Sequence, residues 1–113
     1  MAMLAICMPI LPGKKARWQE MMDRLGEEPL KSWFKTSREE AGVHERTFLQ
    51  ETPAGDFVII TLEGDNPAES FGKMMHADPP GDLDWAEFAA DVHGLDMNGP
   101  PPAMPQLVFD SRD

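Results

Sequence analysis

The run His44-Glu45-Arg46 brings together residue types that could do chemistry, inside a stretch otherwise rich in apolar residues. Glu45 or a histidine could serve as the base in a proton-transfer reaction. Successive side chains of a strand alternate between its two faces, so His44 and Arg46 point to one face and Glu45 points to the other. The run is therefore not one reactive cluster, and the surroundings of Glu45 must be considered separately.

The residues that follow predict a hairpin. The segment Thr52–Gly55 has the composition of a turn, and we expect Glu51 to pair with Asp56 across it. In that register Glu45 lies opposite Leu62, on a face that is otherwise apolar. Glu45 is then either a desolvated site group with a raised pKa or an edge residue whose carboxylate reaches water, and we favour the edge residue.

The opposite face of this hairpin is expected to carry charge at one end of the sheet. The same register sets His44 opposite Glu63 and Arg46 opposite Thr61. These residues are typical of a sheet edge or of a contact between subunits. A slip of one residue in the turn would change every one of these partners.

The three histidines, His44, His76 and His93, lie in different segments, and no cysteine stands at ligand spacing from any of them. We therefore expect no metal site. His76 and His93 each lie near the end of a predicted helix, where either could face inward and bind haem or simply be stabilised by the helix dipole. We favour the latter interpretation and expect no cofactor, and we keep Glu45, His44 and His76 as candidate catalytic residues.

Large apolar side chains in the predicted helices could line a pocket for an apolar or aromatic small molecule. We expect Trp33, Phe71, Met75 and Trp85, together with Glu45, to contact such a ligand. At helical spacing the same aromatic and methionine side chains are also typical of an ordinary core, so both interpretations stay open.

Length, charge and cysteine content narrow the class of protein. The 113 residues are enough for one domain with one core. The formal net charge of −10 argues against nucleic acid or anionic membranes as partners. The single cysteine, Cys7, allows no intramolecular disulfide and lies in an apolar run, where we expect it in the core. That run is too short for a membrane span and follows no basic residues, which favours the cytoplasm.

Changes of hydrophobic period and turn residues divide the chain into eight expected elements. Asn66 and Asp84 are each followed three residues later by a glutamate, a pattern typical of helix starts. The expected order is a strand over 3–8, helices over 14–25 and 30–41, strands over 43–51 and 56–63, helices beginning at 67 and 85, and, after a Pro-rich connection over 96–106, a strand over 107–109.

This order predicts one α+β domain over residues 1–113, with the split β-α-β arrangement of ferredoxin-like folds. Its four-stranded antiparallel sheet would have the strand order 4-1-3-2. The two central strands should then be the most apolar, as the sequences MLAICM and FVIITL are. Since helices can cover only one face of such a sheet, we expect a homodimer in which two sheets pack face to face.

The chain resembles small proteins of the dimeric α+β barrel superfamily in PILPGK, in the Trp-bearing helix that follows, in SREEAGVHERTFLQE and in FVIITLEGDNPAESF. That superfamily includes antibiotic-biosynthesis-type monooxygenases, haem-degrading monooxygenases and muconolactone isomerases, and the likeness is to its uncharacterised small bacterial members. The resemblance extends over about the whole chain. It implies a dimer with a pocket between sheet and helices, and it carries over no catalytic residue.

Two functions remain open at this point. The first is a small enzyme or ligand-binding protein that acts on an apolar or aromatic molecule, as a cofactor-independent monooxygenase or isomerase; it predicts a cavity of a few hundred Å³ with a convergent polar group. The second is a non-catalytic ligand-binding or interaction dimer, which predicts a filled core.

Overall fold

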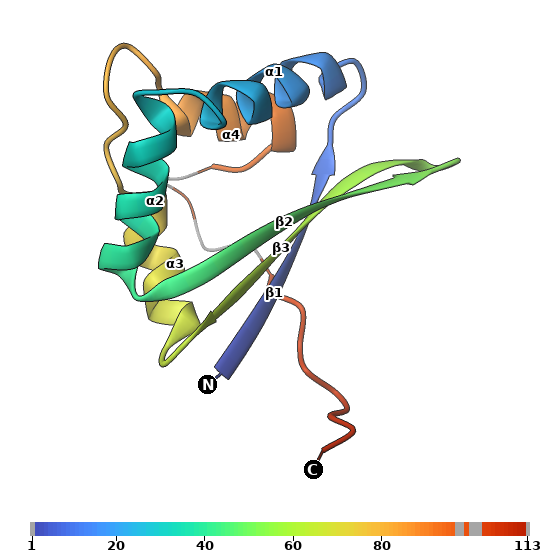
Figure 1. The fold of residues 1–113 in the computed structure, drawn as a ribbon. Helices are drawn as coiled ribbons and strands as arrows, with labels where there is room; N and C mark the ends of the chain where they lie inside the picture. The colour runs from blue at the N-terminus through green and yellow to red at the C-terminus, as the bar shows by residue number, and fades with distance from the viewer. Residues whose placement is uncertain (1, 97–98, 100–102, 113) are drawn as a thin grey trace.

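The computed structural model of the chain describes residues 2–96, 99 and 103–112. It is an α+β structure in which pairs of helices alternate with strands (Figure 1). The elements are β1 (Ala2–Ile10), α1 (Lys15–Leu25), α2 (Leu30–Ala41), β2 (Val43–Thr52), β3 (Gly55–Gly64), α3 (Pro67–Met75) and α4 (Trp85–His93). These seven elements lie where the sequence predicts them, and several strand bounds extend by one or two residues.

The sheet has three strands in the order β1-β3-β2, and both neighbouring pairs are antiparallel. This is the order predicted for the first three strands. The predicted hairpin register is also confirmed, with Glu51 opposite Asp56, Glu45 opposite Leu62 and His44 opposite Glu63. Both faces of the hairpin therefore carry the side chains that the sequence assigns to them.

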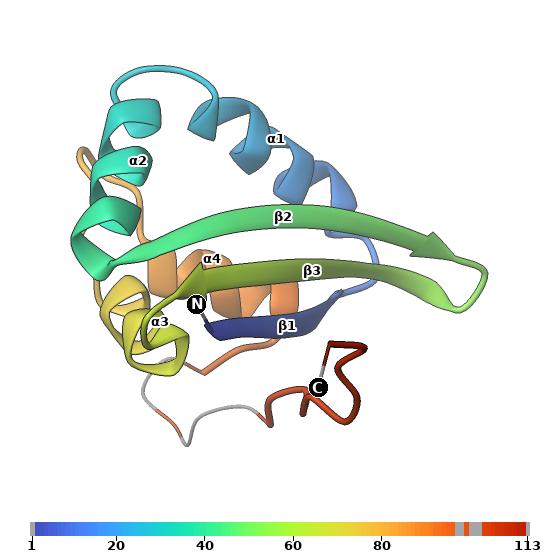
Figure 2. The same cartoon turned by 60° about the horizontal axis from the view of Figure 1, so that its bottom comes forward.

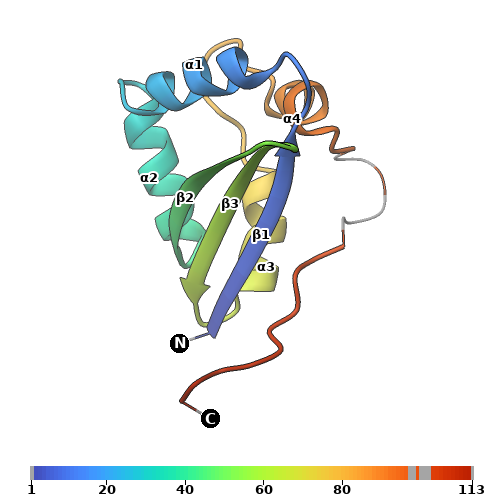
Figure 3. The same ribbon diagram turned by 90° about the vertical axis from the view of Figure 1, so that its right-hand side faces the viewer.

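The fourth strand predicted at Leu107–Phe109 is absent from the described residues, which form no strand after α4. Leu107, Val108 and Phe109 are instead 76%, 89% and 79% exposed. Figure 3 shows this segment apart from the sheet. A three-residue strand recovers few hydrogen bonds, which do not offset the conformational entropy lost when a tail is ordered. The predicted Pro-rich connection, 96–106, lies partly outside the described residues.

All four helices cover one face of the sheet, as Figures 1 and 2 show. Side chains of β1 alternate accordingly: Ile6, Met8 and Ile10 are buried against the helices, whereas the residues between them are exposed. The core lies in this single layer between sheet and helices. Its buried members include Trp18, Met21, Val58, Leu62, Met74, Phe88 and Val92.

The other face of the sheet is open and partly apolar. Cys7 of β1, Ile59 of β3 and Phe48 of β2 form one row across it. Phe48 is 51% exposed, and Met3, which lies on the same face of β1 as Cys7, is 56% exposed. The prediction of Cys7 as a core residue is wrong, because strand alternation turns its thiol to this open face.

Two contacts fix the elements that border the candidate site. Gly42 ends α2 in the left-handed conformation, and its carbonyl oxygen would lie only 2.3 Å from a Cβ at position 64, so the start of β2 packs closely on Gly64. At the other end of the sheet, the Leu11 amide donates to the Val92 carbonyl at 2.8 Å, which ties the end of β1 to α4. In the part of the chain that the structure describes, no helix is long and apolar enough to cross a membrane.

Candidate functional site

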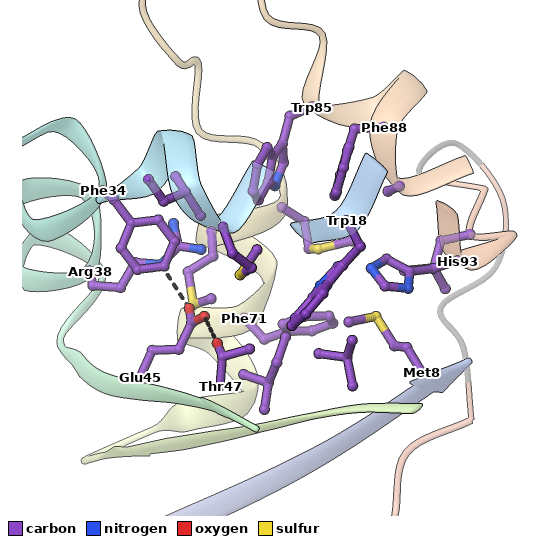
Figure 4. A pocket seen from close by; sticks show the side chains of 18 residues that line it. Met8, Trp18, Phe34, Arg38, Glu45, Thr47, Phe71, Trp85, Phe88 and His93 are labelled. Carbon is purple, nitrogen blue, oxygen red and sulfur yellow. Dashed lines mark hydrogen bonds and ion pairs between the residues drawn. The ribbon is translucent and has the colours of Figure 1, made fainter. Parts of the chain in front are cut away.

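A cavity of about 90 Å³ lies between the sheet and the helices (Figure 4). All four helices contribute to its wall, and the inner faces of the three strands complete it. The wall is mostly aromatic and thioether. Its aromatic residues are Trp18, Phe34, Phe71, Trp85 and Phe88, and its methionines are Met8, Met22, Met74 and Met75.

The helix spacing explains how these side chains converge. Side chains three or four positions apart lie on one side of a helix. On α4, Trp85, Phe88 and Ala89 follow this spacing, and Asp84 caps the helix by accepting a hydrogen bond from the Glu87 amide at 3.0 Å. The capped start of α4 therefore sets the direction in which its aromatic residues enter the cavity.

A buried ion pair forms the polar end of the cavity. Arg38 Nε donates to Glu45 Oε1 at 2.8 Å, and the two side chains are only 8% and 5% exposed. Thr47 Oγ1 donates to the other carboxylate oxygen of Glu45 at 3.1 Å. The Arg38 guanidinium lies 3.8 Å above the centre of the Phe34 ring and also donates to Ser37 Oγ at 2.9 Å. The pair thus has compensating charges and hydrogen bonds on both sides.

These contacts settle the position of Glu45. Its side chain does not reach water at a sheet edge, so that interpretation is wrong. The carboxylate points from β2 towards α2, where Arg38 lies four residues before Gly42. Arg38 was not among the predicted site residues. Its spacing of four from Phe34 on an amphipathic helix was the available signal.

His93 lies at the opposite side of the cavity from Arg38 and Glu45 in Figure 4. Its Nδ1 lies 2.8 Å from the carbonyl oxygen of Pro9 in β1. Burial lowers the pKa of the His93 imidazole below its usual value, and the hydrogen bond to Pro9 opposes only part of that shift. Its ring meets Phe88 edge to face at 6.1 Å. The cavity therefore holds a neutral imidazole at one end and an ion pair at the other.

From sequence, His93 is either an inward-facing histidine for haem or a histidine stabilised by the helix dipole, and the second interpretation is favoured. The sequence Val92-His93-Gly94 is the available signal for its position, because it sets the histidine next to an apolar residue at the end of a helix that Gly94 caps. What sequence could not show is that the α4 terminus is fixed beside Pro9 through the bond between Leu11 and Val92.

The structure brings some of the predicted site residues together and separates others. Glu45, Phe71, Met75 and Trp85 line this cavity. Trp33 is not among the described lining residues of this cavity, but its ring lies 6.0 Å from that of Trp85 in an edge-to-face contact. Trp85 in turn stacks on Phe88 at 5.7 Å.

The two other candidate catalytic residues lie outside the cavity. His44 is exposed on the open face of the sheet, opposite Glu63. His76 is the exposed C-cap of α3. Among the described residues, no three histidine, cysteine or carboxylate side chains gather in a group that could hold a metal ion.

Comparison of the sequence with protein-family models and with curated proteins, and of the structure with solved structures, finds no match. The geometry of this cavity is therefore the basis for the function proposed below.

Proposed function

We propose that this chain binds a small apolar or aromatic molecule in the cavity between the sheet and the helices. The observation that carries the proposal is the buried Arg38–Glu45 pair at the edge of an otherwise aromatic and thioether wall. Ligand sites combine a mostly apolar lining with a few fixed polar groups in this way. A core that served packing alone would gain little from a buried ion pair, because desolvation of the two charges offsets their attraction.

The size of the cavity favours a single ring as the ligand. At about 90 Å³ it is smaller than the few hundred Å³ expected from sequence. An engineered apolar cavity of about 150 Å³ accepts benzene. Four methionines line the wall, and their unbranched side chains can move aside at little cost. A one-ring molecule could then enter after a small rearrangement of these side chains.

Cofactor-independent monooxygenation and isomerisation are the candidate reactions, since both begin when a side chain removes a proton from the substrate. Among the predicted catalytic residues, Glu45 is the one at the cavity. Each of its oxygens already accepts one hydrogen bond, so a substrate would have to share this carboxylate with Arg38 and Thr47. Binding is thus better supported than catalysis.

A thermal-shift screen tests the binding proposal. The panel holds neutral one-ring aromatics, small aromatic acids, quinones and haem. We expect neutral one-ring compounds to raise the melting temperature in a concentration-dependent way, since a ligand that binds only the folded state stabilises it. A panel in which no member shifts the melting temperature at millimolar concentration would contradict the proposal.

We also propose that the chain forms a homodimer in which the open sheet faces of two copies pack together. The support is the apolar row of Cys7, Ile59 and Phe48 on a face that none of the helices in the described residues covers (Figure 3). The exposed apolar tail, Leu107–Phe109, would add the fourth strand beside β1 in such a dimer and complete the α+β barrel. The second candidate function, a non-catalytic interaction dimer, is favoured by the same open face and by the small size of the cavity.

A further inference from the structure

His93 presents a hydrogen-bond acceptor to the cavity. The Pro9 carbonyl can only accept a hydrogen bond, so the His93 nitrogen 2.8 Å away from it, Nδ1, carries the proton. A neutral imidazole has one N–H, and the other nitrogen keeps a free lone pair. Nε2 is therefore an acceptor, and the tautomer is fixed by the backbone of β1.

The position of the ring directs this lone pair inward. His93 lines the cavity, and Figure 4 shows the edge of its ring directed towards Trp18. Pro9 is the one hydrogen-bond partner of the His93 side chain among the described residues. The bond between the Leu11 amide and the Val92 carbonyl holds the helix end so that the ring stays in this orientation.

The rest of the cavity favours a neutral ligand. The positive charge of Arg38 is already balanced by Glu45, and burial of the His93 ring keeps it uncharged near pH 7. The described lining residues then leave no net charge to offset the desolvation of a carboxylate or a phenolate. A ligand with a neutral donor group meets both conditions.

We propose that the ligand carries a neutral hydroxyl on its ring, of the phenol or enol class, and that this hydroxyl donates a hydrogen bond to His93 Nε2. The inference rests on the proposed function and names the chemical class of its ligand. It also makes His93, at the far end of the cavity from Glu45, the residue that distinguishes hydroxylated from plain rings.

Phenol and toluene provide a matched pair of probes, since they have nearly the same shape and differ in the hydroxyl. The test measures the dissociation constants of both for the wild-type chain and for His93→Asn. An asparagine amide can still donate to the Pro9 carbonyl at the position of Nδ1, but it offers nothing in place of Nε2. We expect the substitution to weaken phenol relative to toluene on the order of tenfold, the effect of one lost hydrogen bond in a buried site.

The outcomes separate the two proposals. If both compounds bind and His93→Asn leaves their ratio unchanged, the inference is overturned while the proposed function stands. If neither compound binds to the wild-type chain, the inference and the proposed function are both overturned. A second measurement needs no variant: the ¹⁵N chemical shifts of the wild-type His93 ring should show a protonated Nδ1 and a free Nε2. The opposite tautomer would overturn the inference.

Discussion

The Arg38–Glu45 ion pair lies in surroundings where a lone charge is costly. Both side chains are almost fully buried, and Phe34 covers the guanidinium. The attraction between two buried charges roughly balances the cost of removing them from water, whereas one buried charge without its partner is strongly destabilising. The two residues should therefore behave as a unit when either is changed.

Substitution Glu45→Leu removes the counter-ion of Arg38 while keeping a side chain of similar size. We expect the free energy of unfolding to fall by about 3–5 kcal/mol, because the guanidinium stays buried without a partner. The double variant Arg38→Met with Glu45→Leu should recover most of this loss. Urea denaturation measures the free energy of unfolding of the wild-type chain, of Glu45→Leu and of the double variant.

The matched control is Glu63→Leu on the other face of the same hairpin. Glu63 lies 3.6 Å from Arg46 in a partly exposed pair, for which we expect a change of about 0–1 kcal/mol. Equal losses for Glu45→Leu and Glu63→Leu would contradict the account of the buried pair.

Stability should also depend on pH through His93. Its pKa is lower in the folded chain than the ordinary value of 6.5, so below pH 6.5 the unfolded chain binds a proton that the folded chain resists. The contribution of neutral His93 is fully present above pH 6.5 and is lost as pH falls through the lowered pKa. Denaturation at pH 7.5 and pH 5.5 should show this loss in the wild-type chain and not in His93→Asn.

Exposed His76 is the control for this measurement. The substitution His76→Asn removes an exposed histidine that lies outside the cavity, and the loss of stability at pH 5.5 should be seen in this variant as well. A pH dependence that survives in His93→Asn would show that another group is responsible.

The sequence predicts some contacts of single residues and not others. The face and the cross-strand partner of Glu45 follow from strand alternation and the turn at Thr52–Gly55, and both are confirmed. Its ion-pair partner does not follow, because the contact between Arg38 and Glu45 depends on the angle at which the chain leaves α2 through Gly42. The Gly42 carbonyl also packs so closely on Gly64 that a Cβ would not fit there, a long-range contact that local propensity does not predict.

At the scale of elements, α4 carries one wall of the cavity and depends on its N-cap. We expect Asp84→Ala to lower the free energy of unfolding by about 1 kcal/mol, since the Glu87 amide loses its acceptor. It should also weaken ligand binding, because Trp85 and Phe88 follow the cap directly. Urea denaturation and a toluene titration measure the two effects.

Asp82, two residues earlier and exposed, serves as the comparison. Asp82→Ala removes the same charge without removing a cap, so neither property should change measurably. A similar loss in both variants would mean that charge, and not capping, is responsible.

The elements also show why the last strand was predicted and does not form. Repeated apolar spacing and capping residues predict the helices and the central strands, and the bounds of these elements were predicted to within a few residues. Leu107–Phe109 has the composition of a strand but only three residues. Whether such a segment pairs depends on the surface available to it, which the sequence of one chain does not specify.

At the scale of the whole molecule, the proposed homodimer is tested at the open sheet face. One chain has a mass of 12.6 kDa, and light scattering at micromolar concentration should give twice that value for the wild-type chain. Phe48→Glu places a charge at the β2 end of the apolar row, and we expect it to give the mass of one chain. A wild-type mass of 12.6 kDa would contradict the dimer.

The control for this measurement lies on the helical side of the molecule. Lys31→Glu changes an exposed residue of α2 by more charge than Phe48→Glu and should leave the mass unchanged. Dissociation of both variants would point to net charge rather than to the sheet face.

The central claim, that the cavity binds a small aromatic molecule, is tested most directly by filling it. Ala89 is a buried residue of its wall on α4, and Ala90 beside it is exposed. In calorimetric titrations with toluene, we expect the wild-type chain and Ala90→Leu to bind equally, and Ala89→Leu to lose binding while its circular dichroism stays that of the wild type. Binding that persists unchanged in a folded Ala89→Leu variant would contradict the account.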